Sequence, residues 1–217
     1  MITHHLSDEY LVEYAAGSCP HAESLVVASH LALCGECRAR VEAFETVGAV
    51  MLEDGDVEEV STGAFDAVMA MIAVSGADER PRRIEFDEAT LRTIPAPLRE
   101  HLDASLPDLE WKRVSRGVDE VRLHDDQGIR ISLLRAQAGT KLPSHTHAGE
   151  EFTLVLDGGY SDSDGHYRRG DVTLADSTTD HSPIADDNGP CVCLLVRNGA
   201  ARLTGPVARF LNPFIQG

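Results

Sequence analysis

The sequence predicts an α+β protein with two domains, a small all-α helical bundle followed by an all-β barrel or sandwich. In the first 76 residues, apolar side chains recur at helical spacing. From residue 98 onward, short apolar runs alternate with Gly, Pro, Asp and Ser, which is typical of antiparallel β-structure. Residues 77–97 are punctuated by proline and predict a linker with at most one short ordered piece. The predicted domains are therefore 1–76 and 98–217.

Four helices are expected in the first domain. Ser7 has the chemistry of an N-cap for a helix over Asp8–Ala16, and two amphipathic helices follow over Ala22–Leu33 and Glu36–Leu52. After an acidic loop, a fourth helix carries an apolar stripe of Phe65, Val68, Met69 and Ile72. Such a stripe packs either into the core of its own domain or against a partner protein.

Strands are expected in the second domain where apolar runs are bounded by turn residues. The clearest are Ile129–Leu134, Phe152–Leu156, Asp171–Leu174 and Cys191–Val196.

Charge narrows the function classes. The 217 residues carry a net charge of −17, and this nearly excludes direct binding of DNA or RNA, which draws its affinity from Lys and Arg. The first 76 residues hold 11 of the 17 excess negative charges. This acidity is either an ordinary solvated surface or a docking surface for a basic partner.

The ends and apolar runs of the sequence predict a cytoplasmic protein that makes no membrane contact. Residues 1–10 are polar and acidic, unlike a signal peptide, and no run approaches the roughly 18 apolar residues that span a bilayer. In a reducing compartment, the five cysteines are expected to be metal-bound, redox-active or buried rather than paired in disulfides.

The first chemical motif is His30-Leu-Ala-Leu-Cys34-Gly-Glu-Cys37. On one helix, these offsets would place an imidazole and two thiolates on the same face, where they could bind a tetrahedral Zn²⁺. A fourth ligand must come from elsewhere, with His5 the first candidate, His4 the second and His21 the third. Two alternatives remain open, namely a buried core histidine with two buried cysteines, and a metal-free Cys-x-x-Cys redox pair.

This motif, within a small acidic helical domain and behind an upstream histidine, resembles the ChrR-type zinc-binding anti-sigma factors. Members of that family bind extracytoplasmic-function sigma factors and keep them from RNA polymerase. The resemblance implies the zinc ligands His5, His30, Cys34 and Cys37. It extends over the whole chain, because members of this type carry a C-terminal cupin domain.

The second motif is the run from Gly139 to Gly158, which fits the first cupin motif G(x)5HxH(x)3E(x)6G at every fixed position. Residues two apart on a strand face the same way, so His145 and His147 share one interior, and Glu151 can reach them from the next strand. His181 would complete a site of three histidines and one carboxylate, although Thr178-Thr179-Asp180 replaces the usual Pro-x-Gly turn before it. This motif narrows the predicted β-domain to a cupin jelly-roll barrel.

Imidazole and carboxylate ligands suit Zn, Mn, Fe or Ni, and the family resemblance implies zinc. We therefore expect a second zinc site, or another divalent ion, at His145, His147, Glu151 and His181. The same ligand set could belong to a dioxygenase-like cupin enzyme with a zinc-stabilised helical appendage. A third option is a plain scaffold or small-molecule-binding module.

Cys191 and Cys193 are predicted to point to the same face of a late strand, where they are either a redox-sensing pair or two small buried hydrophobes.

For the whole chain, the sequence predicts a non-enzymatic anti-sigma factor. Its sigma-contacting residues would be Phe65, Val68, Met69 and Ile72. The resemblance implies release of the sigma factor when the cupin domain senses singlet oxygen or an organic hydroperoxide.

Overall fold

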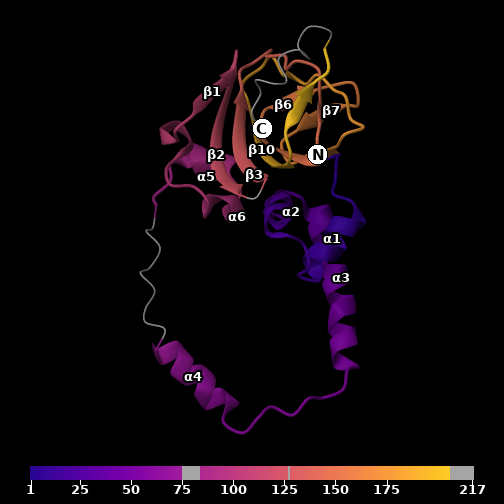
Figure 1. Cartoon of the computed structure of the whole chain (residues 1–217), viewed down its shortest axis with the longest axis vertical. Coiled ribbons are helices and arrows are strands. Elements are labelled where there is room, and N and C mark those ends of the chain that lie inside the picture. The colour runs from indigo at the N-terminus through magenta and orange to yellow at the C-terminus, as the bar shows by residue number, and fades with distance from the viewer. Residues whose placement is uncertain (75–83, 127, 206–217) are drawn as a thin grey trace.

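The computed structural model describes residues 1–74, 84–126 and 128–205. The helices within these ranges are α1 (Asp8–Ala15), α2 (His21–Leu33), α3 (Gly35–Glu53), α4 (Ala64–Val74), α5 (Glu88–Thr93), α6 (Ala96–Arg99) and a 3₁₀ turn at Leu106–Asp108. Helices α1 to α3 form a bundle beside the β-domain, whereas α4 lies apart from both (Figure 1). The sequence-based bounds of the first three helices agree with α1 to α3 to within one residue at each end.

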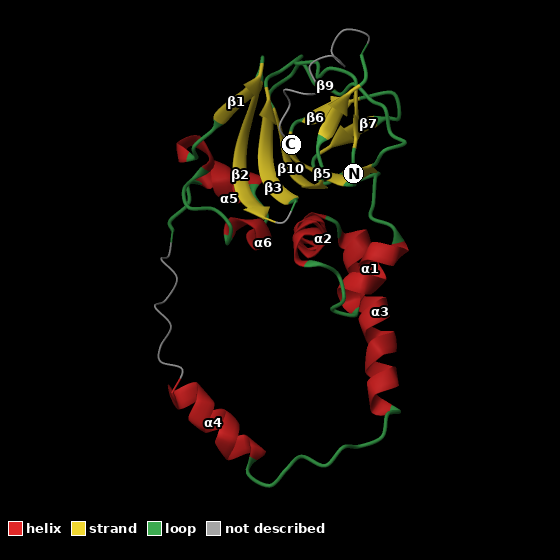
Figure 2. Cartoon of the chain, viewed as in Figure 1, coloured by secondary structure: helices red, strands yellow, loops and turns green. Residues whose placement is uncertain are grey.

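The β-domain is an antiparallel barrel. Its strands are β1 (Lys112–Ser115), β2 (Val118–Asp126), β3 (Ile129–Ala136), β4 (His145–His147), β5 (Glu151–Asp157), β6 (Gly159–Ser161), β7 (His166–Arg168), β8 (Val172–Ala175), β9 (Ile184–Ala185), β10 (Cys191–Asn198) and β11 (Ala201–Leu203). Six of them form a large sheet in the order β1-β2-β3-β10-β5-β8. Smaller sheets, β7-β6-β9 and β11-β4, close the other side (Figure 2). This is the helical region followed by a cupin-like barrel that the sequence predicts.

The central strand β10 of the large sheet is buried on both faces, which explains its unbroken apolar run. One face turns toward the barrel interior and contributes Cys191, Cys193 and Leu195 to a small core with Tyr160. The other face turns toward the helices and contributes Leu194, among others, to the larger core. Alternation along β10 therefore separates the inner cysteines from the outer core.

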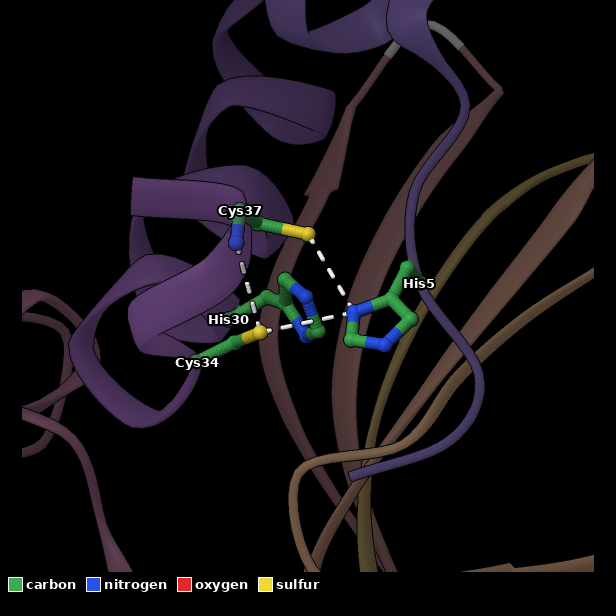
Figure 3. Close-up of side chains that lie close together, drawn as sticks. All are labelled: His5, His30, Cys34 and Cys37. Atoms are coloured by element: carbon green, nitrogen blue, oxygen red, sulfur yellow. Dashed lines mark hydrogen bonds between the residues drawn. The ribbon is translucent and has the colours of Figure 1, made fainter. Parts of the chain in front are cut away.

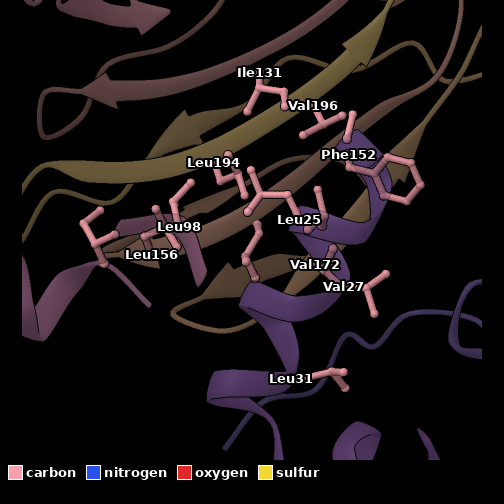
Figure 4. Packing of buried hydrophobic residues seen from close by; sticks show 14 of the residues in the cluster. Leu25, Val27, Leu31, Leu98, Ile131, Phe152, Leu156, Val172, Leu194 and Val196 are labelled. Atoms are coloured by element: carbon pink, nitrogen blue, oxygen red, sulfur yellow. The ribbon is translucent and has the colours of Figure 1, made fainter. Parts of the chain in front are cut away.

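The outer core joins the two parts of the chain. Figure 4 shows α2 lying across the sheet, with Leu25 close to Phe152 and Leu194. Residues from α1 to α3 and from the β-domain belong to one cluster of buried side chains. The helical bundle is thus packed onto the barrel.

The segment predicted as a linker, residues 77–97, contains more structure than expected. Residues 75–83 lie outside the described ranges, but α5 and the start of α6 fall within the predicted segment. Asp87 caps α5 by accepting a hydrogen bond from the Thr90 backbone N–H at 2.7 Å, and Ile94 is buried in the shared core. The prolines and charges of this segment predicted an irregular linker. In the structure, the burial of Ile94 and the Asp87 cap of α5 order its second half. The division into domains at residues 76 and 98 stays a prediction.

Helix α4 has no buried residue, and Phe65 is 75% exposed. The interpretation of its apolar stripe as core of its own domain is therefore wrong. Phe65, Val68, Met69 and Ile72 form an exposed apolar stripe along one side of α4, and Met71 and Val74 are exposed as well. Acidic residues surround it in sequence, namely Glu53, Asp54, Asp56, Glu58, Glu59 and Asp66. An apolar stripe of this kind, rimmed by charge, marks an interaction surface.

In the part of the chain that the structure describes, no helix combines the length and apolar character needed to cross a membrane.

Candidate metal centres

The first cluster lies where the N-terminal segment meets the junction of α2 and α3. His30 is in the last turn of α2, Cys34 lies between the helices, and Cys37 is in the first turn of α3. Cys34 has extended backbone angles (φ −108°, ψ 106°), so the expectation of three ligands on one continuous helix is wrong. Its thiol instead accepts a hydrogen bond from the Cys37 N–H and caps α3.

His5 comes from the segment before α1 and completes the cluster (Figure 3). Its Nδ1 lies 3.4 Å from both the Cys34 and the Cys37 sulfur. One ligand atom from each of His5, His30, Cys34 and Cys37 can be chosen so that all four lie within 4.8 Å of one another. Of the other two candidate ligands, His4 packs against Tyr167 and His21 against His101.

The donor atoms of this cluster fit a tetrahedral metal ion. In the Zn²⁺ geometry, nitrogen and sulfur ligands stand about 3.5 Å apart, close to the distances found here. His30 Nδ1 is hydrogen-bonded to the Gly170 carbonyl at 2.9 Å, while its buried Nε2 has no hydrogen-bond partner among the described residues. A buried nitrogen without a partner is costly unless a ligand satisfies it. The outer Nε2 of His5 faces the Glu36 carboxylate at 3.6 Å, the kind of support that metal-binding histidines have.

Near pH 7, the imidazole of His30 is neutral and can bind a metal ion, whereas the Cys37 thiol must first lose its proton. Burial, together with neighbouring Cys34, raises the pKa of the Cys37 thiol to about 11. Burial also lowers the pKa of His30, which keeps its imidazole neutral near pH 7. Without a metal ion, the Cys37 thiol therefore retains its proton at neutral pH.

Binding of Zn²⁺ at this cluster is therefore expected to release at least one proton at pH 7. Since only the thiolate binds the ion, the apparent affinity should rise at least tenfold per pH unit between pH 6 and 8. Titration calorimetry in buffers of different ionisation enthalpy counts the released protons. The Cys37→Ser variant, which is expected to lose the zinc ion of this cluster, should show no proton release from it and so gives the background of the measurement. An affinity that does not change with pH would contradict this assignment.

The second cluster lies inside the barrel. His145 and His147 are the two ends of β4, and His181 joins them through backbone hydrogen bonds of 3.0 and 3.1 Å with His145. The Nε2 atoms of His147 and His181 are 3.3 Å apart, and the three histidines form a second group that could hold a metal ion. In place of Pro-x-Gly, the Asp176 carboxylate accepts the Thr178 N–H at 2.8 Å and so forms the turn that delivers His181.

Each histidine of this group is supported through its outer nitrogen. Nδ1 of His145 bonds the Pro143 carbonyl at 2.8 Å, and Nδ1 of His181 bonds the Asp162 carboxylate at 3.0 Å. Nδ1 of His147 faces a Glu151 oxygen at 3.7 Å. These partners fix the rings with Nε2 directed toward one another.

Glu151 is buried beside the histidines but is not in their group of converging ligand atoms. Its Oε2 lies 3.8 Å from the Arg197 guanidinium, which also pairs with Glu120 at 2.9 Å. The role of Glu151 as the fourth ligand stays a prediction. Sequence spacing also missed Asp162 and Arg197, because neither belongs to a motif that marks a metal site.

Burial sets the charges of this second cluster. It lowers the pKa of His147 to about 4, with neighbouring His145 and His181 adding to the effect, and it lowers the pKa of His145 as well. Burial raises the pKa of Glu151. The imidazoles of His145 and His147 are therefore neutral near pH 7, as metal ligands must be.

A cavity of about 60 Å³ connects this cluster with the cysteine pair, and both thiols line it together with His145, Glu151 and His181. The sulfurs of Cys191 and Cys193 are 3.6 Å apart. The neighbouring Cys191 and burial raise the pKa of Cys193 well above its usual range, which keeps that thiol protonated. Tyr160 also lines this cavity, whereas His166 pairs with Asp186 at 3.0 Å.

The fold and the two clusters together define a cupin-type protein with two candidate metal centres, one in the barrel and one on the helical bundle. A family model described as the ChrR cupin-like domain matches residues 101–201. The anti-sigma-E factor ChrR of Cereibacter sphaeroides is 34% identical over 215 residues, which is 99% of either chain. The chain belongs to the family of ChrR anti-sigma factors.

A solved structure shows the same likeness. The Rhodobacter sphaeroides complex of SigE with the anti-sigma ChrR matches with 36% identity and a TM-score of 0.75, covering 90% of this chain and 99% of that chain. Membership in this family makes the chain a regulatory protein rather than an enzyme, which answers the metalloenzyme alternative.

Proposed function

We propose that this chain binds an extracytoplasmic-function sigma factor in the cytoplasm and keeps it from RNA polymerase. The exposed stripe of α4 carries the proposal, since an unburied apolar helix face needs a partner. The acidic residues around the stripe suit a basic surface, such as one that otherwise contacts DNA or polymerase. The solved complex of a full-length relative with SigE supports a sigma factor as that partner.

The sigma-binding part is proposed to be the helical domain of residues 1–76. His5, His30, Cys34 and Cys37 would hold a structural zinc ion there. When bound, that ion would cross-link the N-terminal segment to α2 and α3. The chain's own residues then keep α3 oriented, and α3 leads directly into the acidic loop and α4.

The cupin domain is proposed to be the sensor of oxidative stress. His145, His147, Glu151 and His181 would bind zinc or another divalent ion, and Cys191 and Cys193 share their cavity. A cavity of about 60 Å³ has room for a very small reactant, such as singlet oxygen or the peroxide end of an organic hydroperoxide. Because both thiols are buried, reaction would be confined to molecules that reach this cavity.

The test begins with co-purification of the full chain with extracytoplasmic-function sigma factors of the source genome. The bound sigma factor should be unable to bind core RNA polymerase, and it should be released after exposure to singlet oxygen or tert-butyl hydroperoxide. Failure to bind any of these sigma factors would refute the proposal. A metal analysis of the same sample should find two zinc equivalents.

The His147→Ala variant is expected to bind the sigma factor as the wild type does but to release less than a tenth as much after singlet oxygen. The reason is that His147 lies in the barrel cluster, away from α4. His166→Ala is the matched control, since this histidine is exposed and pairs with Asp186 within the barrel. Release measured by gel filtration after illumination distinguishes the variants. Sigma release without any oxidant in His147→Ala would count against a sensory role.

A further inference from the structure

The turn between β7 and β8 of the barrel reaches the metal cluster of the helical bundle. Its Gly170 carbonyl accepts the hydrogen bond from Nδ1 of His30 at 2.9 Å. This bond leaves Nε2, the buried nitrogen without a partner, facing the cluster. One of the two candidate imidazole ligands is therefore oriented by the other domain.

The next residue of the turn, Asp171, binds the backbone just before His5, the second candidate imidazole ligand. Asp171 is 1% exposed, and its Oδ1 accepts the backbone N–H groups of Thr3 and His4 at 2.7 and 2.9 Å. Its Oδ2 accepts the Arg168 N–H at 2.8 Å, and the Val172 N–H donates to the His4 carbonyl at 3.2 Å. Hydrogen bonds to a buried carboxylate are short and strong. They fix the chain immediately before His5.

The close approach also depends on the glycine of this turn. Gly170 has φ +91°, a backbone conformation that favours glycine. A Cβ at this position would lie 2.4 Å from Cδ1 of Ile2, so a side chain there would displace the N-terminal segment. The N-terminal segment can therefore pack this closely against the turn because residue 170 is a glycine.

We propose that Gly170 and Asp171 are positioning residues of the N-terminal metal centre, through which the cupin domain sets the metal affinity of the helical domain. The inference rests on the proposed metal site at His5, His30, Cys34 and Cys37. Groups that orient metal-binding histidines are worth about 10- to 100-fold in metal affinity. By linkage, a metal ion in the cluster strengthens docking of residues 2–5 on the barrel by the same factor.

The position of the turn connects the two candidate centres. Asp171 directly precedes β8, which pairs with β5 in a register that places Ala175 opposite Glu151. Glu151 lies beside the barrel cluster. The residue opposite it on β8, Ala175, is four positions after Asp171, which lies in the turn that contacts His30 and the segment before His5. A change at the barrel cluster that shifted β8 would reach the helical cluster through this turn.

The test uses the full chain loaded with Co²⁺, because thiolate ligands give Co²⁺ a charge-transfer absorption that nitrogen and oxygen ligands lack. Retention of this absorption under competition by a chelator reports the affinity of the thiolate cluster. Asp171→Asn removes the negative charge that accepts the N–H groups of Thr3, His4 and Arg168, and these contacts are called the clamp. Thr3→Pro removes one of the two backbone N–H groups of this segment that Asp171 accepts, together with the Thr3 hydroxyl, and changes no residue of the barrel. Asp119→Asn is the control, since Asp119 is a buried carboxylate whose partners, Arg113 and Arg135, are both in the barrel.

Asp171→Asn and Thr3→Pro are each expected to weaken Co²⁺ retention at least tenfold, and the double variant no more than the stronger single one, because both break the same clamp. Asp119→Asn should retain Co²⁺ as the wild type does. Wild-type affinity in Thr3→Pro and Asp171→Asn, or an equal loss in Asp119→Asn, would overturn the inference alone. Absence of the thiolate absorption in the wild type would overturn the metal site and the inference together.

Discussion

The Cys37→Ser variant is expected to lose the zinc of the helical domain and at least 100-fold in affinity for the sigma factor. Cys37 is fully buried, and its sulfur lies 3.4 Å from the proposed ligand nitrogen of His5. In small metal-bound domains the free energy of metal binding is largely free energy of folding, about 10–16 kcal/mol for structural zinc. Without it, α3 would lose its cross-link to the N-terminal segment and keep the Arg40–Asp8 ion pair and the packing of Val41 in the shared core, so α4 would be presented in a less defined direction.

Metal content, thermal unfolding and sigma binding are measured on the same preparation. Cys19→Ser is the matched control, because Cys19 is a half-buried cysteine of the same domain that lies outside the cluster. It should keep one full equivalent of zinc in the helical domain. A folded Cys37→Ser variant that binds the sigma factor with wild-type affinity would show that the cluster has no structural role.

The double variant Phe65→Asp/Met69→Asp is expected to bind the sigma factor at least 100-fold more weakly, a loss of about 3 kcal/mol, while its stability stays within about 0.5 kcal/mol of the wild type. Both side chains are exposed on α4, so their loss removes no contact of the buried core. Apolar anchors at the centre of an interface commonly carry most of its binding energy.

The control for this variant is Ala67→Asp/Ala70→Asp, which adds the same charge to the opposite face of α4. Affinity is measured by surface plasmon resonance and stability by thermal unfolding. Equal losses in both double variants would mean that added charge, and not the apolar stripe, weakens the complex. An unchanged affinity in Phe65→Asp/Met69→Asp would exclude α4 as the sigma contact.

Local patterns in the sequence predicted α1 to α4, four of the strands and the spacing of the histidines and cysteines that the two clusters bring together. Apolar residues at helical spacing located α1 to α3, and short apolar runs bounded by turn residues located β3, β5, β8 and β10. The spacing of His145 and His147 placed both on one short strand facing the interior. These features depend on residues close together in the chain, which is why a pattern could find them.

What the sequence could not predict depends on contacts between distant residues. Nothing in its local pattern shows that Leu25 of α2 packs against the sheet that carries Leu194, or that Asp171 binds the segment before His5. The single-helix geometry of the first cluster was wrong because the extended backbone of Cys34 separates α2 from α3, a break that the predicted helix bounds contain but the spacing of four and three residues ignores. Ile94 was assigned to a linker because it is buried in the core shared with the helical bundle, and the sequence around it does not show that packing.

The shared core has a consequence for a chain that is cut. Residues 54–62 between α3 and α4 are exposed, so this connection is accessible to a protease. A single cleavage there would leave α1 to α3 on one piece and the barrel on the other, yet the buried contacts of α2 with β5 and β10 would still hold the pieces together. The nicked protein would behave as a complex of two complementing fragments. An isolated fragment ending at residue 76, in contrast, would present the sheet-facing side of α2 to water.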